Sequence, residues 1–341
     1  MEDDFDQDVL LDVRRLSVTF AGGVRALRGV SFQVRAGEVV ALVGESGSGK
    51  STSGLAVMGL IERDRGAEVS GEIRLRGKDG DEKEITGLSE RELRALRGND
   101  VAMIFQEPMS SLNPIYAIGS QICEAIRIHR SVSRAEAARD AREALDLLGI
   151  PNPDRCMVSY PHQLSGGMRQ RVMIAMALAC RPRMLIADEP TTALDVTIQA
   201  QIIAHLKRLQ RQTGMAILFI THNLGLVAEI ADRAMVMYAG EIVESGPVAD
   251  IFGAPRMPYT RALLQSLPRL GVTRASGTRI EAIPGNVPSS ARWPSGCAFH
   301  PRCRYVVAGR CDASEPMLEA CDTGRHRVRC LRWRELEKVA S

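Results

Sequence analysis

Eight consecutive residues have the types and the spacing of a phosphate-binding loop, G-x-x-x-x-G-K-[ST]: Gly44-Glu45-Ser46-Gly47-Ser48-Gly49-Lys50-Ser51. Glycines let successive backbone N–H groups turn towards one anion. The lysine can reach the β- and γ-phosphates of a nucleotide, and the final serine can bind Mg²⁺. The predicted nucleotide contacts are Gly44, Ser46, Gly47, Gly49, Lys50, Ser51 and Thr52.

The residues on either side of this loop argue against an ordinary glycine-rich turn. The apolar run from Val39 to Val43 predicts a buried strand, and the segment from Lys50 to Leu60 predicts a helix. A helix N-terminus adds positive dipole where the phosphates would lie. The strand–loop–helix context therefore predicts a nucleoside triphosphate site.

A second apolar run ends in two adjacent acids, in the stretch Met184-Leu185-Ile186-Ala187-Asp188-Glu189. A buried carboxylate is costly unless it is paired or bound to a metal. In a chain with a phosphate-binding loop, we interpret Asp188 as a ligand of Mg²⁺, directly or through water. Glu189 would then be the general base that polarises the attacking water. The alternative is an ordinary strand end with two solvated acids.

A third stretch, Leu164-Ser165-Gly166-Gly167-Met168-Arg169-Gln170, predicts another anion contact at the start of a helix. Ser165 can cap the helix, and the two glycines let backbone N–H groups approach an anion. A chain that binds one nucleotide by itself does not need two such loops. We therefore expect this loop to close over the γ-phosphate held by a facing subunit; a plain helix cap is the alternative.

These stretches resemble the ATP-binding-cassette (ABC) ATPases. They occur in the order of that family, together with Gln106, Ala193-Leu194-Asp195 and Thr221-His222, and the resemblance covers about Val9 to Pro255. Within the family, residues 105–114 are similar to the Q-loop of the ATPase subunits of bacterial dipeptide, oligopeptide and nickel permeases. Residues 160–168 are similar to their signature loop. Met168 stands where glutamine is commoner in the wider family. Methionine at this position resembles the peptide-permease subfamily.

The resemblance implies roles for four further residues, with ATP and Mg²⁺ as cofactors. Gln106 would sense Mg²⁺ and the attacking water and link the core to a helical insertion. His222 would contact the γ-phosphate, and Asp195 would organise a dimer interface. Phe20 would stack on the adenine, because its ring offers the required π face. The alternative for Phe20 is a core residue of a strand.

The pattern of apolar residues places these motifs on an α/β core. Apolar runs predict strands at 9–20, 30–34, 39–43, 70–76, 101–105, 184–187, 216–221 and 234–238, and residues 120–150 read as helical. By resemblance the fold is that of a RecA-like P-loop NTPase, an ABC nucleotide-binding domain with an antiparallel β subdomain and a helical insertion at about 107–178. The expected organisation is a disordered acidic N-terminus at 1–8, the ATPase domain at 9–254 and an irregular cysteine-rich extension at 255–341.

Composition limits the class of protein. The formal net charge of +3 over 341 residues does not indicate a nucleic-acid partner. No apolar run is long enough to span a bilayer, and no signal peptide is found. We therefore expect a cytosolic chain, or one bound to a membrane only through a partner.

The eight cysteines are distributed unevenly, and five of them stand at 297, 303, 311, 321 and 330. Cytosolic thiols stay reduced, so disulfides are not expected. Three interpretations remain: unligated thiols, a structural zinc site, or an iron–sulfur cluster. Zinc prefers closely paired ligands such as C-x₂-C, whereas the first two gaps here are longer. The stretch resembles the extension of peptide-permease ATPases that is associated with a [4Fe–4S] cluster. This implies Cys297, Cys303, Cys311 and Cys330 as ligands in a structural role, with no counterpart for Cys321.

The function implied by the resemblance is ATP hydrolysis coupled to uptake of dipeptides or oligopeptides. The implied partners are a second ABC ATPase subunit, identical or different, two transmembrane permease subunits and an extracytoplasmic substrate-binding protein, at the cytoplasmic face of the inner membrane. An importer of nickel or another solute is an alternative. ABC ATPases without a transport role would show a long coiled coil, two cassettes in one chain, or the loss of Glu189 or of the signature glycines. None of these features is found in the sequence.

Overall fold

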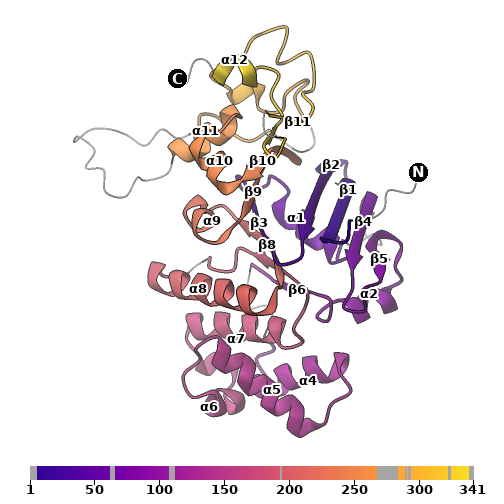
Figure 1. The fold of residues 1–341 in the computed structure, drawn as a ribbon, viewed down its shortest axis with the longest axis vertical. Coiled ribbons are helices and arrows are strands. Elements are labelled where there is room, and N and C mark those ends of the chain that lie inside the picture. Colours follow the sequence, from indigo (N-terminus) through magenta and orange to yellow (C-terminus); the bar gives the residue numbers. More distant parts are fainter. Residues whose placement is uncertain are drawn as a thin grey trace, which may run out of the picture.

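The computed structural model describes residues 6–61, 66–106, 112–192, 194–266, 283–288, 290, 293–321 and 324–337. Within these residues the strands form two sheets, drawn as arrows in Figure 1. The smaller sheet has the order β2-β1-β4-β5 and consists of β1 (Val9–Phe20), β2 (Val24–Arg35), β4 (Glu68–Arg76) and β5 (Glu82–Glu84). All its strand pairs are antiparallel, which confirms the expected β subdomain.

The larger sheet is mixed and has the order β11-β12-β10-β9-β3-β8-β7-β6. Its parallel part consists of β6 (Val101–Ile104), β7 (Met184–Asp188), β8 (Ala216–Thr221), β3 (Val39–Val43) and β9 (Arg233–Tyr238). Every residue of β3, β6, β7 and β8 is buried. Strands covered on both faces require continuous apolar runs, which is the pattern from which they were predicted. Strand β6 ends one residue earlier than expected, because Phe105 is exposed.

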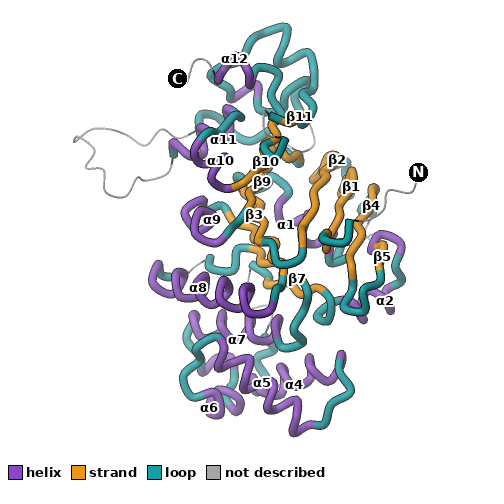
Figure 2. Tube along the Cα trace, in the orientation of Figure 1, coloured by secondary structure: helices purple, strands orange, loops and turns teal. Residues whose placement is uncertain are grey.

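Two helical groups cover this sheet, and Figure 2 shows them in purple beside the strands. Helix α1 (Lys50–Val57) follows the phosphate-binding loop, while α8 (Val196–Thr213) and α9 (Leu224–Ile230) follow β7 and β8. The expected insertion consists of α4 (Ile118–His129), α5 (Arg134–Leu147), α6 (Pro153–Val158) and α7 (Gly166–Leu178). The helical pattern at 120–150 is therefore two helices, since the chain leaves α4 at Arg130 and Ser133 caps α5.

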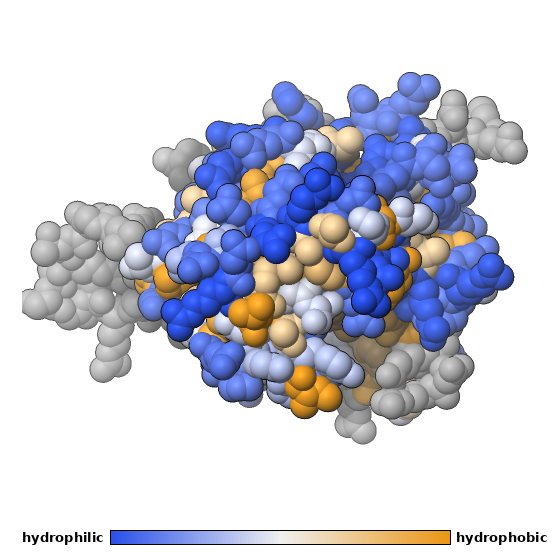
Figure 3. All heavy atoms as spheres, turned by 90° about the horizontal axis from the view of Figure 1, so that it is seen from below, coloured by the Kyte–Doolittle hydropathy of each residue, from blue (hydrophilic) through white to orange (hydrophobic). Residues whose placement is uncertain are grey.

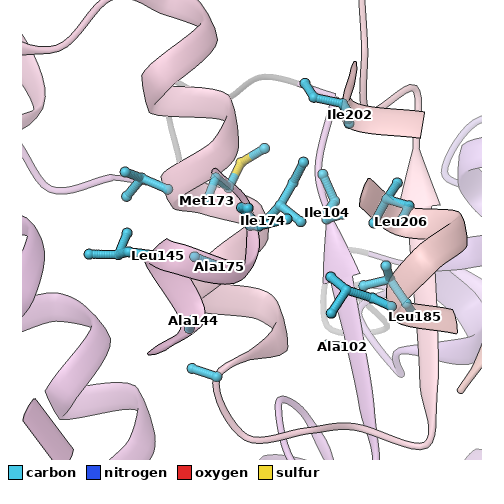
Figure 4. Packing of buried hydrophobic residues seen from close by; sticks show 14 of the residues in the cluster. Ala102, Ile104, Ala144, Leu145, Met173, Ile174, Ala175, Leu185, Ile202 and Leu206 are labelled. Atoms are coloured by element: carbon cyan, nitrogen blue, oxygen red, sulfur yellow. The ribbon is translucent and has the colours of Figure 1, made fainter. Parts of the chain in front are cut away.

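One apolar core joins the insertion to the sheet. In Figure 4, Met173, Ile174 and Ala175 of α7 lie between Leu145 of α5 and Ile104 of β6. Ile202 and Leu206 of α8 complete the same cluster. Burial of this continuous surface fixes α7 and α8 against the strands that carry the predicted acids.

The C-terminal part of the chain continues the larger sheet. Strand β12 (Arg327–Val328) pairs with β10 (Glu241–Pro247), and β11 (Glu319–Ala320) pairs with β12. The remaining helical elements are α2 (Glu90–Leu96), α10 (Val248–Gly253), α11 (Pro258–Gln265) and α12 (Trp333–Glu337), with short 3₁₀ turns at Ile85–Gly87, Pro161–Gln163 and His300–Arg302. The absence of clear periodicity beyond 254 concealed α11 and α12.

Some expectations lie outside the described residues: positions 1–5 of the acidic N-terminus, residues 107–111 of the Q-loop stretch, Ala193, and residues 267–282. Among the helices that the structure does describe, none is both long enough and apolar enough to cross a membrane.

Candidate functional site

The phosphate-binding loop lies between β3 and α1, and its glycines are required by close backbone contacts. A Cβ atom on Gly44 would stand 2.2 Å from the carbonyl oxygen of Met237, and one on Gly49 would stand 2.6 Å from that of Ala26. Gly49 also has a φ of +104°, which side chains disfavour. The local fold therefore excludes side chains where the predicted motif has glycine.

Lys50 is buried at the start of α1, and its ammonium donates to the carbonyl oxygens of Gly44 and Glu45, at 2.9 Å each. Burial lowers the pKa of Lys50, while the carboxylates of Glu189 and Asp188 act in the opposite direction. The ammonium thus lies within the loop and beside the acid pair, where a phosphate would neutralise it.

Asp188 ends β7 with only 4% of its surface exposed and accepts a hydrogen bond from Ser51. Burial raises its pKa, and the Glu189 charge adds to this, against the opposing effects of Ser51 and Lys50. Its Oδ1 atom and the hydroxyl of Ser48 are buried without a hydrogen-bond partner among the described residues. The buried carboxylate oxygen of Asp188, with the Ser51 hydroxyl bonded to the same carboxylate, is an oxygen donor set that suits Mg²⁺.

Glu189 follows directly and has a φ of +46°, a strained value for a residue with a side chain. Its Oε1 lies 2.9 Å from Nδ1 of His222, which donates to it. Its Oε2 accepts from the Thr192 hydroxyl at 2.9 Å and from Nε2 of Gln106 at 3.3 Å. Burial raises the pKa of Glu189, but the hydrogen bonds from His222 and Thr192 outweigh it, so the pKa lies below its usual value. The carboxylate is therefore held ionised.

The parallel sheet explains why these residues meet. Gln106, Glu189 and His222 follow β6, β7 and β8, which are neighbours in the sheet order. The carboxyl ends of neighbouring parallel strands meet at one edge. Thr192 was not predicted as a site residue. The sequence feature that could have indicated it is a hydroxyl three residues after Glu189, in a turn that returns towards the acid.

The second predicted anion loop begins α7. The Ser165 hydroxyl accepts from the N–H of Met168 at 3.3 Å, as a helix cap. No atom lies within 4 Å of the position a Cβ atom would take on Gly166, and the loop faces solvent. Behind it, the buried Gln170 side chain donates to the carbonyl oxygen of Pro190. This bond, which sequence analysis missed, links the loop to the turn after Glu189.

The other two predicted contacts are placed less specifically. Phe20 ends β1, opposite Val24, and packs partly buried against the apolar cluster of the β subdomain. Asp195 stands at the N-cap position of α8 without a side-chain capping bond and is exposed, beside Val196, which is 80% exposed.

The four cysteines predicted as ligands line one cavity of about 20 Å³, and Cys321 does not. The sulfurs of Cys311 and Cys330 each accept a backbone N–H at 3.4 Å, from Val307 and Arg332. Backbone N–H groups also bond to Cys297 and Cys303, from the residue two positions later in each case. Burial raises the pKa of Cys297 to about 11 and that of Cys330 to about 12. Nevertheless, no set of three or more His, Cys, Asp and Glu side chains in the described part of the chain is arranged to hold a metal ion.

Comparison with known proteins gives family matches in both parts of the chain. Residues 27–192 match the family described as ABC transporter, and residues 243–311 match the oligopeptide/dipeptide transporter C-terminal region. A Brucella melitensis protein named for ATP binding in peptide import is 53% identical over 96% of this chain and 98% of its own length. The dipeptide transport ATP-binding protein DppD of Escherichia coli is 50% identical over 93% and 94%. Among solved structures, the dimeric ATP-binding cassette MJ0796 bound to ADP and Pi has a TM-score of 0.62 and 27% identity, covering 70% of this chain and 99% of its own.

Proposed function

Because this chain belongs to the family of ABC transporter ATP-binding subunits, we propose that it powers an importer of dipeptides or oligopeptides. It is an ATPase, and its fold is the ABC cassette. The single observation that carries the enzymatic part of the proposal is the meeting of Gln106, Glu189 and His222 at one edge of the sheet.

The proposed chemistry relies on positioning and electrostatics. The backbone of the glycine loop and the Lys50 ammonium hold the phosphates. Ser51 and Asp188, with Gln106, would hold Mg²⁺, which neutralises phosphate charge when bound. Glu189 accepts the proton of the attacking water, and His222 holds that carboxylate in place. A base whose pKa is low is ionised at neutral pH, so it needs no prior deprotonation.

The loop of Ser165, Gly166 and Gly167 supports a head-to-tail pair of cassettes, because it faces solvent at the start of α7, where backbone N–H groups can meet an anion. We propose that it closes over the γ-phosphate of a second ATPase subunit, identical or different. Asp195 and the exposed Val196 at the start of α8 would lie at this interface. Phe20 is proposed to stack on the adenine.

The surface of the helical insertion supports contact with permease subunits. Figure 3 views the end of the molecule that carries α4, α5 and α6, where apolar side chains lie among hydrophilic ones. Ile115 and Val158 are each 71% exposed and Tyr116 is 54% exposed. Exposed large apolar side chains on one subdomain fit a protein partner. We propose that the chain is held peripherally at the cytoplasmic face of the membrane by two permeases, with substrate delivered by an extracytoplasmic binding protein.

Copurification and stimulated hydrolysis test this function. Tagged chain expressed with the neighbouring reading frames should copurify with two hydrophobic subunits. ATP hydrolysis by the reconstituted complex should rise with a peptide-loaded binding protein. Stimulation by nickel and not by peptides would show that nickel is the substrate. Failure to associate with any membrane subunit would contradict the proposed role in an importer.

We further propose that the four-cysteine cavity holds a [4Fe–4S] cluster, which would tie the irregular extension together by four thiolate bonds. Two observations support the fit: Cys297, Cys303, Cys311 and Cys330 surround one cavity, and each sulfur accepts a backbone N–H. Such hydrogen bonds stabilise thiolate ligands of iron–sulfur clusters.

Metal analysis of anaerobically purified protein tests the cluster. The protein should be brown and contain equal amounts of iron and acid-labile sulfide. Cys330→Ser should lose both, whereas Cys321→Ser should keep them. Colourless protein with one zinc per chain would contradict the cluster, and loss of metal only in Cys321→Ser would contradict the ligand set.

A further inference from the structure

An arginine of the C-terminal extension forms a partly buried ion pair with the phosphate-binding loop. Arg302 lies in the 3₁₀ turn His300–Arg302, next to Cys303, and its side chain is only 5% exposed. Its Nη1 donates to Oε2 of Glu45 at 2.7 Å, and its Nη2 donates to Oε1 at 3.0 Å. Two parallel charge-assisted hydrogen bonds hold a carboxylate in both position and orientation.

Further hydrogen bonds of Arg302 anchor it to two other segments of the chain, residues 283–284 and Tyr238 of β9. Nε donates to the carbonyl oxygen of Pro284 at 2.9 Å, and Nη2 lies 3.5 Å from that of Ile283. Nη1 also donates to the Tyr238 hydroxyl at 3.4 Å, and the guanidinium lies 5.8 Å from the centre of that ring. Since every nitrogen of the guanidinium has a partner, the arginine is fixed before it meets Glu45.

The extension also holds the backbone of Glu45. The N–H of Glu45 donates to the Tyr259 hydroxyl of α11 at 2.9 Å. Tyr259 packs against Tyr238 and Phe299, with ring centres 4.6 and 5.3 Å away. The second residue of the phosphate-binding loop is therefore held at its main chain and its side chain by residues that lie more than 200 positions away.

The charge of Glu45 matters because of where it stands. Its carbonyl oxygen accepts from the Lys50 ammonium, so it belongs to the part of the loop that meets the phosphates. An uncompensated carboxylate there would repel a triphosphate, whereas the pair with Arg302 neutralises it and directs it towards the extension.

We propose that Arg302 is a positioning residue for ATP binding, which neutralises Glu45 and holds it away from the phosphates. The extension is thereby part of the nucleotide site, although no atom of Arg302 needs to touch the nucleotide.

Measurement of MgATP affinity by calorimetry on the full-length chain tests this proposal. Arg302→Gln should weaken binding by about tenfold to 100-fold, the factor that corresponds to the loss of a charge-assisted hydrogen bond. KM should rise with it, whereas kcat at saturating ATP should change little, because the repulsion acts on the bound substrate and on the transition state alike.

Arg329→Gln is the matched control. Arg329 also ties the extension to the core, by donating to the carbonyl oxygen of Ile242 at 3.1 Å and by pairing with Glu241 at 3.4 Å, but it does not reach the loop. Its substitution should leave MgATP affinity unchanged. An Arg302→Gln affinity equal to that of Arg329→Gln would overturn the proposal.

The Glu45→Gln substitution distinguishes an effect of the Glu45 charge from a purely structural role of Arg302. In the Glu45→Gln background, the Arg302→Gln substitution should no longer weaken MgATP binding, because no uncompensated carboxylate remains. An equal loss of affinity in both backgrounds would show that Arg302 only supports the fold and would overturn the proposal. If Arg302→Gln does not fold, Arg302→Lys replaces it: affinity should be intermediate, and the difference between arginine and lysine should vanish in Glu45→Gln.

Discussion

At the scale of single residues, Glu189 combines a strained backbone with three side-chain partners. His222, Thr192 and Gln106 all donate to its carboxylate, and the bonds from His222 and Thr192 outweigh the effect of burial on its pKa. Strain at a residue persists only when its surroundings over-determine it. Here the surroundings are the neighbouring strand ends, which place the carboxylate beside Lys50 and Asp188.

We expect Glu189→Gln to keep ATP binding but to lower turnover by about 10²–10⁴, the usual contribution of a general base. The amide cannot accept the proton of the attacking water. Steady-state ATPase assays and nucleotide-binding measurements on the same protein test this expectation. Lys50→Ala is the contrasting variant: it should weaken nucleotide binding itself, since it removes a charge that pairs with phosphate. Near-normal turnover in Glu189→Gln would contradict the assignment of Glu189 as the general base.

We expect His222→Ala to move the acid limb of the pH profile of kcat to higher pH. The hydrogen bond from His222 is the largest of the effects that lower the pKa of Glu189 against burial. Without it the pKa rises, so the carboxylate becomes protonated, and inactive as a base, at a higher pH. The matched variant is Thr192→Val, which removes the second donor and should shift the limb in the same direction. An unchanged acid limb in both variants would mean that a different group controls it.

At the scale of elements, packing of α7 and α8 on the sheet holds the site together. The α7 helix begins at the signature loop, and its Gln170 bonds to the turn after Glu189. The α8 helix presents Ile202, Ile203, Leu206 and Leu209 to the same core. The loop proposed to face a partner subunit and the acid proposed to act on the nucleotide are therefore joined by one buried layer.

We expect Leu206→Ala to lower the free energy of unfolding by about 2–5 kcal/mol, the usual cost of a cavity at a fully buried leucine. Leu206 is 0% exposed and belongs to the apolar cluster that also contains Ile174 of α7 and Leu185 of β7, all three labelled in Figure 4. Urea denaturation of the full-length chain measures the change. Val196→Ala on the same helix is the control, because Val196 is 80% exposed and should change stability by less than about 0.5 kcal/mol. Equal changes in the two variants would contradict this account of the core.

At the scale of the whole molecule, the exposed signature loop supports the proposal that a single chain is incomplete as a catalyst. Its serine and glycines face solvent, and the phosphate-binding loop lies on a different subdomain. The extension, in contrast, holds the phosphate-binding loop from within the same chain, since Arg302 and Tyr259 bond to Glu45. One half of the nucleotide contacts is thus proposed to come from a partner, and the other half is supported within the chain.

We expect two inactive variants, Ser165→Arg and Lys50→Ala, to regain hydrolysis when they are mixed. In a head-to-tail pair the mixed dimer contains one site with an intact phosphate-binding loop and an intact signature loop, contributed by different chains. ATPase assays across mixing ratios measure this recovery. Each variant mixed with itself is the control. A crosslinked mixed dimer without activity would argue against the head-to-tail arrangement.

Much of the nucleotide site could be predicted because its chemistry is local. The glycine loop, the acid pair and the signature loop each lie within one strand–turn–helix unit, where spacing along the chain sets spacing in space. The buried parallel strands could likewise be predicted from the sequence, since burial on both faces requires continuous apolar runs. By itself, then, the sequence determined the cassette fold and the order of its motifs, and it singled out Lys50, Asp188 and Glu189 as candidate site residues.

Only the tertiary structure decided which distant groups meet these motifs. The bond of Thr192 to Glu189 depends on a turn conformation, and that of Gln170 to Pro190 on how α7 packs. Arg302 and Glu45 are 257 positions apart, and no spacing rule relates them. They meet where Tyr259 and Phe299 of the extension pack on Tyr238 of β9, the strand that neighbours β3, which leads into the phosphate-binding loop. Such contacts arise from the closure of long loops, a property of the whole fold and not of any local pattern.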